Sequence, residues 1–271
     1  IVDTTIVNVA LNDMRGSLGA TLTDVAWVIT AYAIANVIVI PMTSWLSQQF
    51  GRRNYFAASI IIFTFSSFLC GNASGIWELV LFRFIQGLGG GALLVTSQTI
   101  ITESYPIEKR GMAQAIYGMG VIVGPTLGPP LGGYLVDNYS WPYIFYINVP
   151  IGIIATLLTL TYVRSPKYGD KLKSNQVDWW GIITLAMFIG SLQFVLEHGQ
   201  QDDWFNDMTI VIVSIMSFVG LFFFIWRELV YEHPIVNLRV LKDNNLRVGT
   251  ILSFVLGFGL YGSTFIIPIY T

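Results

Sequence analysis

Two charged side chains inside apolar stretches are the residues of this sequence best suited to chemistry. Asp3 lies in the stretch IVDTTIVNVAL, and Arg83 lies in the stretch LFRFIQGLGGG. A charged group at the centre of a bilayer costs about 2.5 to 3.5 kcal/mol on insertion scales, so each residue needs a reason to be there. Such residues commonly belong to proton relays or transport pathways.

Asp3 has a side chain that can carry a proton. It lies about eight to ten residues below the outer end of its apolar stretch, which is about 12 to 15 Å along a helix and close to mid-membrane. Desolvation favours the neutral form of a carboxyl, so a proton gradient can load and unload such a group. A permanent structural ion pair is the alternative interpretation.

Arg83 has a guanidinium that stays charged, so this residue cannot be the proton carrier. Its charge and its fork of donors can bias a nearby acid or an acidic group of a substrate. The alternative is an arginine that joins helices by donating to backbone carbonyls, and one residue can do both. We predict that Asp3 and Arg83 together serve proton coupling.

The elements that position these residues must be helices that cross a membrane. The chain has 271 residues, of which 54% are hydrophobic and 11% are charged, with a mean hydropathy of +0.64. Soluble domains have about 25% charged residues. Apolar runs of about 20 residues can cross the hydrocarbon layer, and they must be helical because lipid offers the backbone no hydrogen-bond partner. Cys70 is the only cysteine. We expect no metal site, no cofactor besides a proton gradient, and no binding of nucleic acid.

The fold predicted is all-α, a polytopic transmembrane bundle truncated to about nine spans. The spans cover residues 1–11, 25–46, 55–73, 77–102, 112–136, 141–163, 178–196, 208–226 and 247–271. The polar residues Asp13, Arg15 and Asp24 are expected in the first loop. Lys and Arg concentrate in alternate connections, which the positive-inside rule assigns to the cytoplasm.

Glycines recur at strict four-residue spacing in the fifth predicted span. They are Gly120, Gly124, Gly128 and Gly132, and Gly133, Pro125, Pro129 and Pro130 lie beside them. This spacing lines one face of a helix with glycine and lets a neighbouring helix approach closely. Proline removes backbone hydrogen bonds and is expected to bend the helix. We predict a tightly packed helix that acts as a gate.

These motifs resemble the major facilitator superfamily, and within it the EmrB/QacA-type drug:proton antiporters with fourteen spans. The resemblance lies in residues 3–11, in residues 83–91, in residues 120–133 and in residues 141–152. In the loop after the second span, Gly51, Arg52 and Arg53 follow the family pattern. Gln48 stands where that pattern has an acid, so a latch built on that charge is in doubt.

The family pattern also implies how the chain is organised. Residues 1–163 form the first six-span half, 164–177 a cytoplasmic linker, 178–227 two inserted spans, 228–246 a cytoplasmic loop and 247–271 the start of the second half. The implied function is proton-coupled efflux of hydrophobic, often cationic or amphipathic drugs by alternating access, without enzymatic activity. A same-fold exporter of a siderophore, a bile salt or a fatty acid is the first alternative, and an integral-membrane enzyme is the second.

The resemblance finally implies a location and partners. The protein is expected in the bacterial inner membrane, in contact with lipid and with drug-like substrates. The EmrB-like entry to the sixth span implies a periplasmic adaptor, an EmrA-like membrane fusion protein, and an outer-membrane channel. The acidic outer loop with Trp204 and Phe205 is the foothold predicted for the adaptor, and aromatic side chains that sit at the lipid headgroups are the alternative interpretation.

Overall fold

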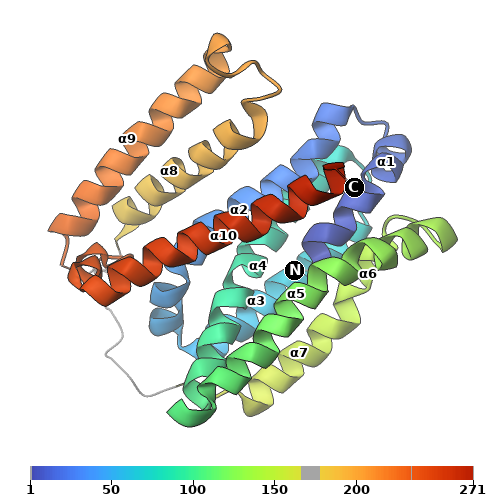
Figure 1. Ribbon diagram of the computed structural model, residues 1–271. Coiled ribbons are helices and arrows are strands. Elements are labelled where there is room, and N and C mark those ends of the chain that lie inside the picture. Colours follow the sequence, from blue (N-terminus) through green and yellow to red (C-terminus); the bar gives the residue numbers. More distant parts are fainter. Residues whose placement is uncertain (1, 166–177, 233, 271) are drawn as a thin grey trace.

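The chain folds into helices joined by short connections (Figure 1). The computed structural model describes residues 2–165, 178–232 and 234–270, with side chains up to residue 257. The described helices are α1 (Val2–Leu18), α2 (Leu22–Phe50), α3 (Arg52–Gly71), α4 (Ile76–Ser104), α5 (Ile107–Asn138), α6 (Tyr143–Tyr146), α7 (Asn148–Tyr162), α8 (Trp179–His198), α9 (Met208–Val230) and α10 (Asn244–Tyr270). Two 3-10 helices, η2 (Trp204–Asn206) and η3 (Leu238–Lys242), lie between them.

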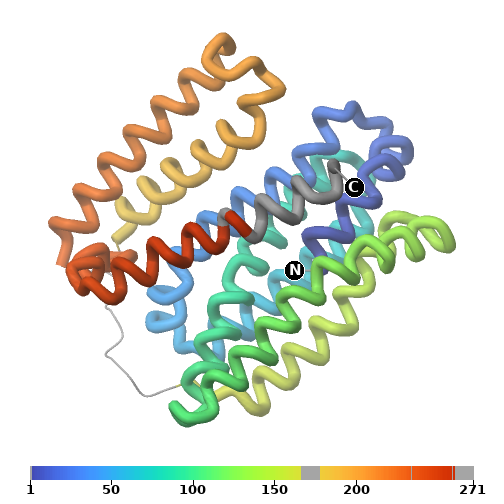
Figure 2. Tube along the Cα trace, viewed as in Figure 1, coloured from blue at the N-terminus to red at the C-terminus, as the bar shows by residue number. Residues whose placement is uncertain are grey.

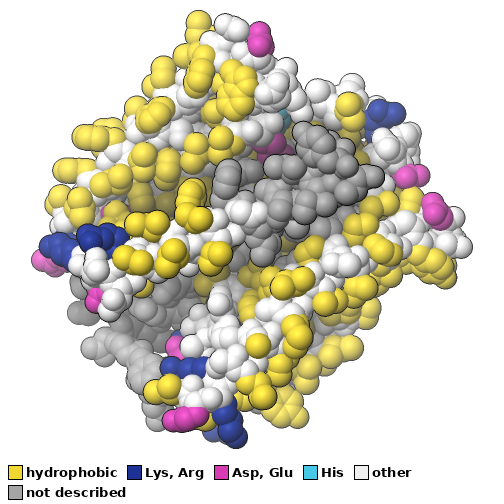
Figure 3. Space-filling view, in the orientation of Figure 1, with side chains coloured by type: hydrophobic (Ala, Val, Ile, Leu, Met, Phe, Trp, Pro, Cys, Tyr) yellow, Lys and Arg dark blue, Asp and Glu magenta, His cyan; other side chains and the backbone are white. Residues whose placement is uncertain are grey.

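The membrane spans expected from hydropathy are present as helices. Within the described residues, seven segments are long and apolar enough to cross a bilayer: α2, α3, α4, α5, α6 together with α7, α8 and α9. Helices α1 and α10 occupy the places of the first and ninth predicted spans. Hydrophobic side chains are spread over the face in Figure 3, and most of the charged side chains seen there lie toward its edges. The prediction of an all-α polytopic bundle is confirmed.

Several helices extend beyond the predicted spans. Asp13 and Arg15, expected in a loop, lie inside α1, and Asp24 belongs to a capping box with Thr21 at the start of α2. Helix α9 ends at Val230, so Glu228, predicted in a cytoplasmic loop, is helical. Hydropathy marks only the apolar part of a helix, so it underestimates the length of a helix that continues through polar residues. The predicted linker 164–177 lies outside the described residues from residue 166 onward.

The first seven helices form one bundle, and α8 and α9 form a hairpin beside it (Figures 1 and 2). In the bundle α4 packs on α2 and α3, α1 packs on α5, and α3 packs on α7. The hairpin reaches the bundle through α8, which lies along α2. Buried apolar side chains at this contact are Met42, Trp45, Leu185, Phe224 and Ile235. Helix α10 contacts η3, and its side chains from Asn244 to Leu256 are exposed.

Glycines of α4 let two neighbouring backbones approach closely. A Cβ atom added to Gly87 would lie 2.6 Å from the carbonyl oxygen of Tyr32 in α2, and one added to Gly89 would lie 2.7 Å from the backbone nitrogen of Phe63 in α3. Side chains at these positions would push the helices apart. The glycines therefore hold α2, α3 and α4 together next to Arg83.

In α5, three of the evenly spaced glycines are buried: Gly124, Gly128 and Gly132. A Cβ atom added to Gly128 would lie 2.9 Å from the Cβ atom of Thr5, and one added to Gly132 would lie 2.9 Å from a side-chain carbon of Ile6. Gly120 and Gly133 have no heavy atom within 4 Å of an added Cβ atom, so they lie outside this contact. The helix is continuous through Pro125, Pro129 and Pro130.

A leucine at Gly128 is expected to disturb the contact between α1 and α5. The new side chain would overlap Thr5, and overpacking of this kind costs about 1 to 3 kcal/mol. We expect Gly128→Leu to lower the thermal stability of the purified full-length protein, and Gly133→Leu to change it much less. Equal melting temperatures for the two variants would show that α5 does not pack on α1 as described.

Candidate functional site

The two charged residues selected from the sequence meet in the interior of the bundle. Asp3 on α1 and Arg83 on α4 form an ion pair in which Nη1 of Arg83 lies 2.6 Å from Oδ2 of Asp3. Their side chains are 3% and 1% exposed, so both charges are removed from solvent. Each charge is neutralised by the other, which is the condition under which charged groups are found in such surroundings.

Amide and hydroxyl groups complete the hydrogen bonding of this pair. Oδ1 of Asp3 accepts from Nδ2 of Asn148 at 2.9 Å and from Nε2 of Gln86 at 3.3 Å. Oε1 of Gln86 accepts from Nη1 of Arg83 at 2.7 Å. The Ser67 hydroxyl accepts from both amides, at 3.1 Å from Gln86 and 3.0 Å from Asn148. The carboxylate is thereby connected to helices α3, α4 and α7.

Arg83 also has partners that do not depend on Asp3. Its Nε donates to the carbonyl oxygen of Val28 at 3.3 Å, and its guanidinium carbon lies 4.1 Å from the centre of the Tyr32 ring. The sequence left open whether Arg83 biases an acid or bonds to backbone, and the structure places it in both contacts. The Cys70 thiol lies beside the network and donates to Oε1 of Gln86 at 3.7 Å.

Some members of this network were not selected as site residues from the sequence. Ser67 and Tyr32 are polar groups inside apolar helices, a signal that is weak because isolated hydroxyl groups are common there. Gln86 and Asn148 fell within motifs but had no assigned role. Asn148 is the first residue of α7, directly after the short helix α6. The break between α6 and α7 places the side-chain amide of Asn148 beside Asp3.

The loop residues Gly51, Arg52 and Arg53 join three helix ends. Gly51 has φ +81° between α2 and α3, a conformation that glycine adopts at little cost. Arg52 pairs with Glu103 in the last turn of α4, with Nη2 at 2.9 Å from Oε1. Arg53 donates to the carbonyl oxygen of Leu160, and its backbone N–H donates to the Ser165 hydroxyl at 3.1 Å. The cationic connections therefore meet at one end of the bundle, as the predicted orientation requires.

Gln48, which replaces the family's acid in this loop, is exposed at the end of α2. In the same region, the ion pair between Arg52 and Glu103 joins the start of α3 to the last turn of α4. Because it is partly exposed, its contribution to stability is about 1 kcal/mol or less.

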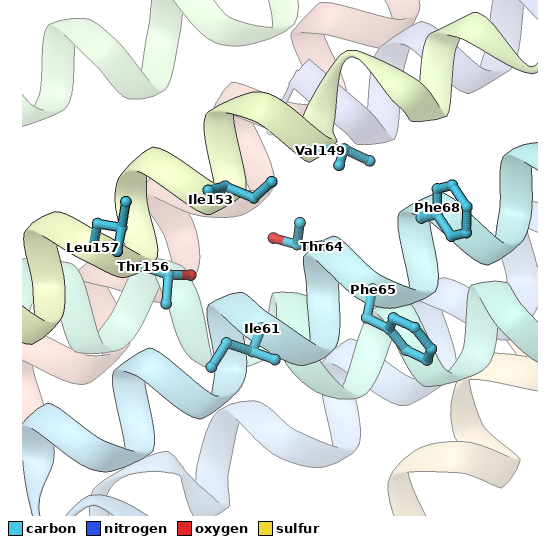
Figure 4. A pocket seen from close by; sticks show the side chains of 8 residues that line it. All are labelled: Ile61, Thr64, Phe65, Phe68, Val149, Ile153, Thr156 and Leu157. Carbon is cyan, nitrogen blue, oxygen red and sulfur yellow. The ribbon is translucent and has the colours of Figure 1, made fainter.

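A cavity of about 330 Å³ lies between α3 and α7 (Figure 4), and none of the residues of the Asp3 network lines it. Figure 4 shows Thr64 and Thr156 among apolar side chains of the two helices. Both threonine hydroxyls donate to carbonyl oxygens of their own helices. The walls include the exposed residues Phe65 and Leu157. Such a surface suits lipid chains and offers no polar group for recognising a solute.

The network of Asp3 places a carboxylate, an arginine and neutral amides in one buried cluster of the bundle. A family model described as the Major Facilitator Superfamily matches residues 1–271. The chain belongs to the major facilitator superfamily. Together with the seven apolar segments, this membership establishes a multi-pass membrane protein.

Comparison with individual proteins shows which branch of the superfamily the chain resembles. The chain is 40% identical over 262 residues to the multidrug export protein EmrB of Escherichia coli, covering 96% of this chain and 51% of that protein. It is 39% identical over 264 residues to the fatty acid resistance protein FarB of Neisseria gonorrhoeae, covering 97% and 52%. The chain thus spans about half the length of the curated relatives it matches. The resemblance to EmrB-type proteins is confirmed.

A solved structure supports the fold. The crystal structure of a bacterial homolog of the human lysosomal transporter Spinster, in an inward-facing and unoccupied conformation, matches with a TM-score of 0.53 and 21% identity. The match covers 100% of this chain and 60% of that chain. At this identity the likeness concerns the arrangement of helices alone.

Proposed function

We propose that the full-length protein is a proton-driven exporter of hydrophobic, often cationic or amphipathic drugs in the bacterial inner membrane. The observation that carries this proposal is the buried pair of Asp3 and Arg83, with its amide partners on neighbouring helices. The similarity to proteins named for multidrug export supports the choice of substrates. In this proposal the protein has fourteen spans, of which this chain supplies the N-terminal part.

Protonation of Asp3 would change which helices the network holds together. A neutral carboxyl no longer compensates the charge of Arg83, so the contact between α1 and α4 weakens. Arg83 keeps its bonds to Val28, Gln86 and the ring of Tyr32, all of which lie on α2 and α4. The bonds that loosen are those of α1. We therefore assign the movement to α1 together with α5, which packs on it through Gly128 and Gly132.

The proton gradient supplies enough free energy for this function. One elementary charge moving through 100 mV gains about 2.3 kcal/mol, and about 1.4 kcal/mol corresponds to tenfold in concentration. One proton can thus maintain a gradient of about fortyfold per 100 mV. The chain contains no P-loop pattern Gly-x-x-x-x-Gly-Lys-Ser/Thr for nucleotide binding.

Transport by the full-length protein in proteoliposomes tests the proposal. An imposed pH gradient is expected to drive accumulation of an amphipathic cationic dye, and a protonophore is expected to abolish that accumulation. A free fatty acid should be measured in parallel, because a relative is named for fatty acid resistance. Transport of the fatty acid without the dye would favour the alternative cargo, and movement of neither compound would contradict proton-driven export.

The outer loop between α8 and α9 is the proposed foothold for the periplasmic adaptor of a tripartite assembly. Trp204 packs back on the end of α8, where a Cβ atom added to Gly199 would lie 2.7 Å from its ring, and it is 39% exposed. Phe205 beside it is 67% exposed. Apolar anchors within a polar rim are common in protein interfaces, and here Asp202 and Asp203 supply polar groups beside the two rings. Phe205 is therefore the stronger candidate for contact.

Removing Phe205 is expected to weaken binding of the adaptor. We expect Phe205→Ala to reduce co-purification of the EmrA-like adaptor with the full-length protein about tenfold, the effect of losing about 1.4 kcal/mol. Phe222→Ala is a matched control, because Phe222 is also 67% exposed but lies in the middle of α9. Unchanged co-purification for both variants would exclude this loop as the main contact.

A further inference from the structure

A second group of buried charges lies at the cytoplasmic end of the hairpin formed by α8 and α9. Oδ1 of Asp178 accepts from Nε of Arg227 at 2.9 Å and from the backbone N–H of Gly181 at 3.0 Å. Oε2 of Glu228 accepts from the backbone N–H of Val236 at 3.1 Å. Asp178 is 1% exposed and Glu228 is 0% exposed. The group contains two carboxyls and one guanidinium.

Each carboxyl of this group has an oxygen without a hydrogen bond. Oδ2 of Asp178 and Oε1 of Glu228 are buried, and neither has a hydrogen-bond partner in the part of the chain that the structure describes. A buried polar atom without a partner costs about 1 to 3 kcal/mol, and more when the group is charged. If both carboxyls were ionised, two negative charges would interact in the same buried region. The arrangement therefore needs a further positive charge or a proton.

The positions of the two carboxyls on their helices decide which of them takes the proton. Asp178 is the N-cap of α8, where the helix dipole favours a negative charge, and Arg227 compensates it. Glu228 lies in the last turn of α9, where the dipole disfavours a negative charge. Of the two carboxyls, Glu228 is therefore the one whose place on its helix favours the neutral form.

Among the described residues, the cation that acts on Glu228 is Arg227, which Glu228 shares with Asp178. Arg227 donates to Asp178 and lies over the ring of Tyr231, with its guanidinium carbon 4.1 Å from the ring centre. Arg239 donates to the carbonyl oxygen of Leu229 at 2.7 Å. The described acids at the two ends of the segment 234–243, Glu232 and Asp243, are exposed. Helix α2 contributes only apolar or uncharged groups here, with Met42 and Trp45.

We propose that Glu228 is a proton-binding site that keeps the segment 234–243 docked on the hairpin. The neutral carboxyl accepts from the N–H of Val236, and Ile235 beside it is 6% exposed among Leu185, Phe224, Met42 and Trp45. Loss of the proton leaves a charge that must reach water, and it can do so when this segment moves away. The site is separate from Asp3, which lies in a different group of helices.

Hydrogen–deuterium exchange of the full-length protein tests this site. The protection factor of a peptide covering residues 235–243 is expected to fall as pH rises. The fall is up to tenfold per pH unit over the range in which the docked form binds one more proton than the undocked form. Glu228→Gln is neutral at every pH and can still accept from Val236. Its protection factor is therefore expected to stay constant over the same range.

Glu103→Gln provides the control, because Glu103 is an exposed acid of a cytoplasmic helix end and should leave the pH dependence unchanged. A wild-type protection factor that does not vary between about pH 5 and 9 would overturn the proposal, whatever the variants do. The same pH dependence in wild type and Glu228→Gln would also overturn it. Infrared detection of a protonated carboxylic acid that disappears in Glu228→Gln is the expected independent result, and its absence from the wild type counts against the site.

Discussion

Asp3→Asn in the full-length protein is expected to abolish proton-driven accumulation in proteoliposomes. Asparagine cannot exchange a proton, so the gradient of about fortyfold per 100 mV available to the wild type should fall to that of empty liposomes. Asp13→Asn is the control, because it makes the same change at an exposed position of α1. Undiminished accumulation by Asp3→Asn would remove Asp3 from proton coupling.

A double variant separates coupling from a purely structural ion pair. Asp3→Asn alone leaves the buried charge of Arg83 without its carboxylate, and loss of one partner of a buried pair commonly costs about 3 to 5 kcal/mol. Adding Arg83→Gln removes the second charge and should recover much of that stability. If Asp3 couples protons, the double variant stays inactive although it is folded. Recovery of gradient-driven transport together with stability would identify the pair as structural.

Gly89→Leu is expected to have the largest effect on folding among the glycine variants. The new side chain would meet the backbone of α3, with a Cβ atom 2.7 Å from both the nitrogen of Phe63 and the carbonyl oxygen of Ser59. Backbone cannot rotate away as a side chain does, so the cost should reach or exceed the upper end of about 1 to 3 kcal/mol for overpacking.

The measurement is the yield and melting temperature of monodisperse full-length protein in detergent. Gly120→Leu is the control, because Gly120 is exposed and an added Cβ atom has no neighbour within 4 Å. We expect near wild-type behaviour for Gly120→Leu and severe loss for Gly89→Leu. Comparable yields of the two variants would contradict the close packing of α3 and α4.

Hydropathy predicted the membrane helices well because their requirement is physical and local. A backbone in lipid must satisfy its own hydrogen bonds, and each crossing needs about 20 apolar residues. The ends of these helices were harder to predict from the sequence. Glu228 was placed in a loop, since a charged residue after an apolar run normally marks the boundary of the span. In the structure the burial of Glu228 depends on the segment around Val236 that folds back over it.

The charged residues of the candidate site could be predicted from the sequence, but the contacts between them could not. Asp3 and Arg83 stand out because a charge in lipid is costly, whatever surrounds it. Their contact, across 80 positions of sequence, depends on how α1 and α4 lie in the bundle. The roles of Ser67 and Tyr32 depend on the same packing, and no spacing in the sequence reveals them. The same holds for Gly89, whose importance comes from the backbone of α3.

The position of Cys70 gives this chain a built-in reporter. Its thiol is fully buried, and the Gln86 oxygen that it contacts also accepts from Arg83. Only the thiolate reacts readily with alkylating reagents, and burial suppresses that reaction. Any rearrangement that separates α3 from α4 near the ion pair would uncover this sulfur. The rate of its alkylation, followed by mass spectrometry, would therefore record opening of the bundle interior without any residue being introduced as a reporter.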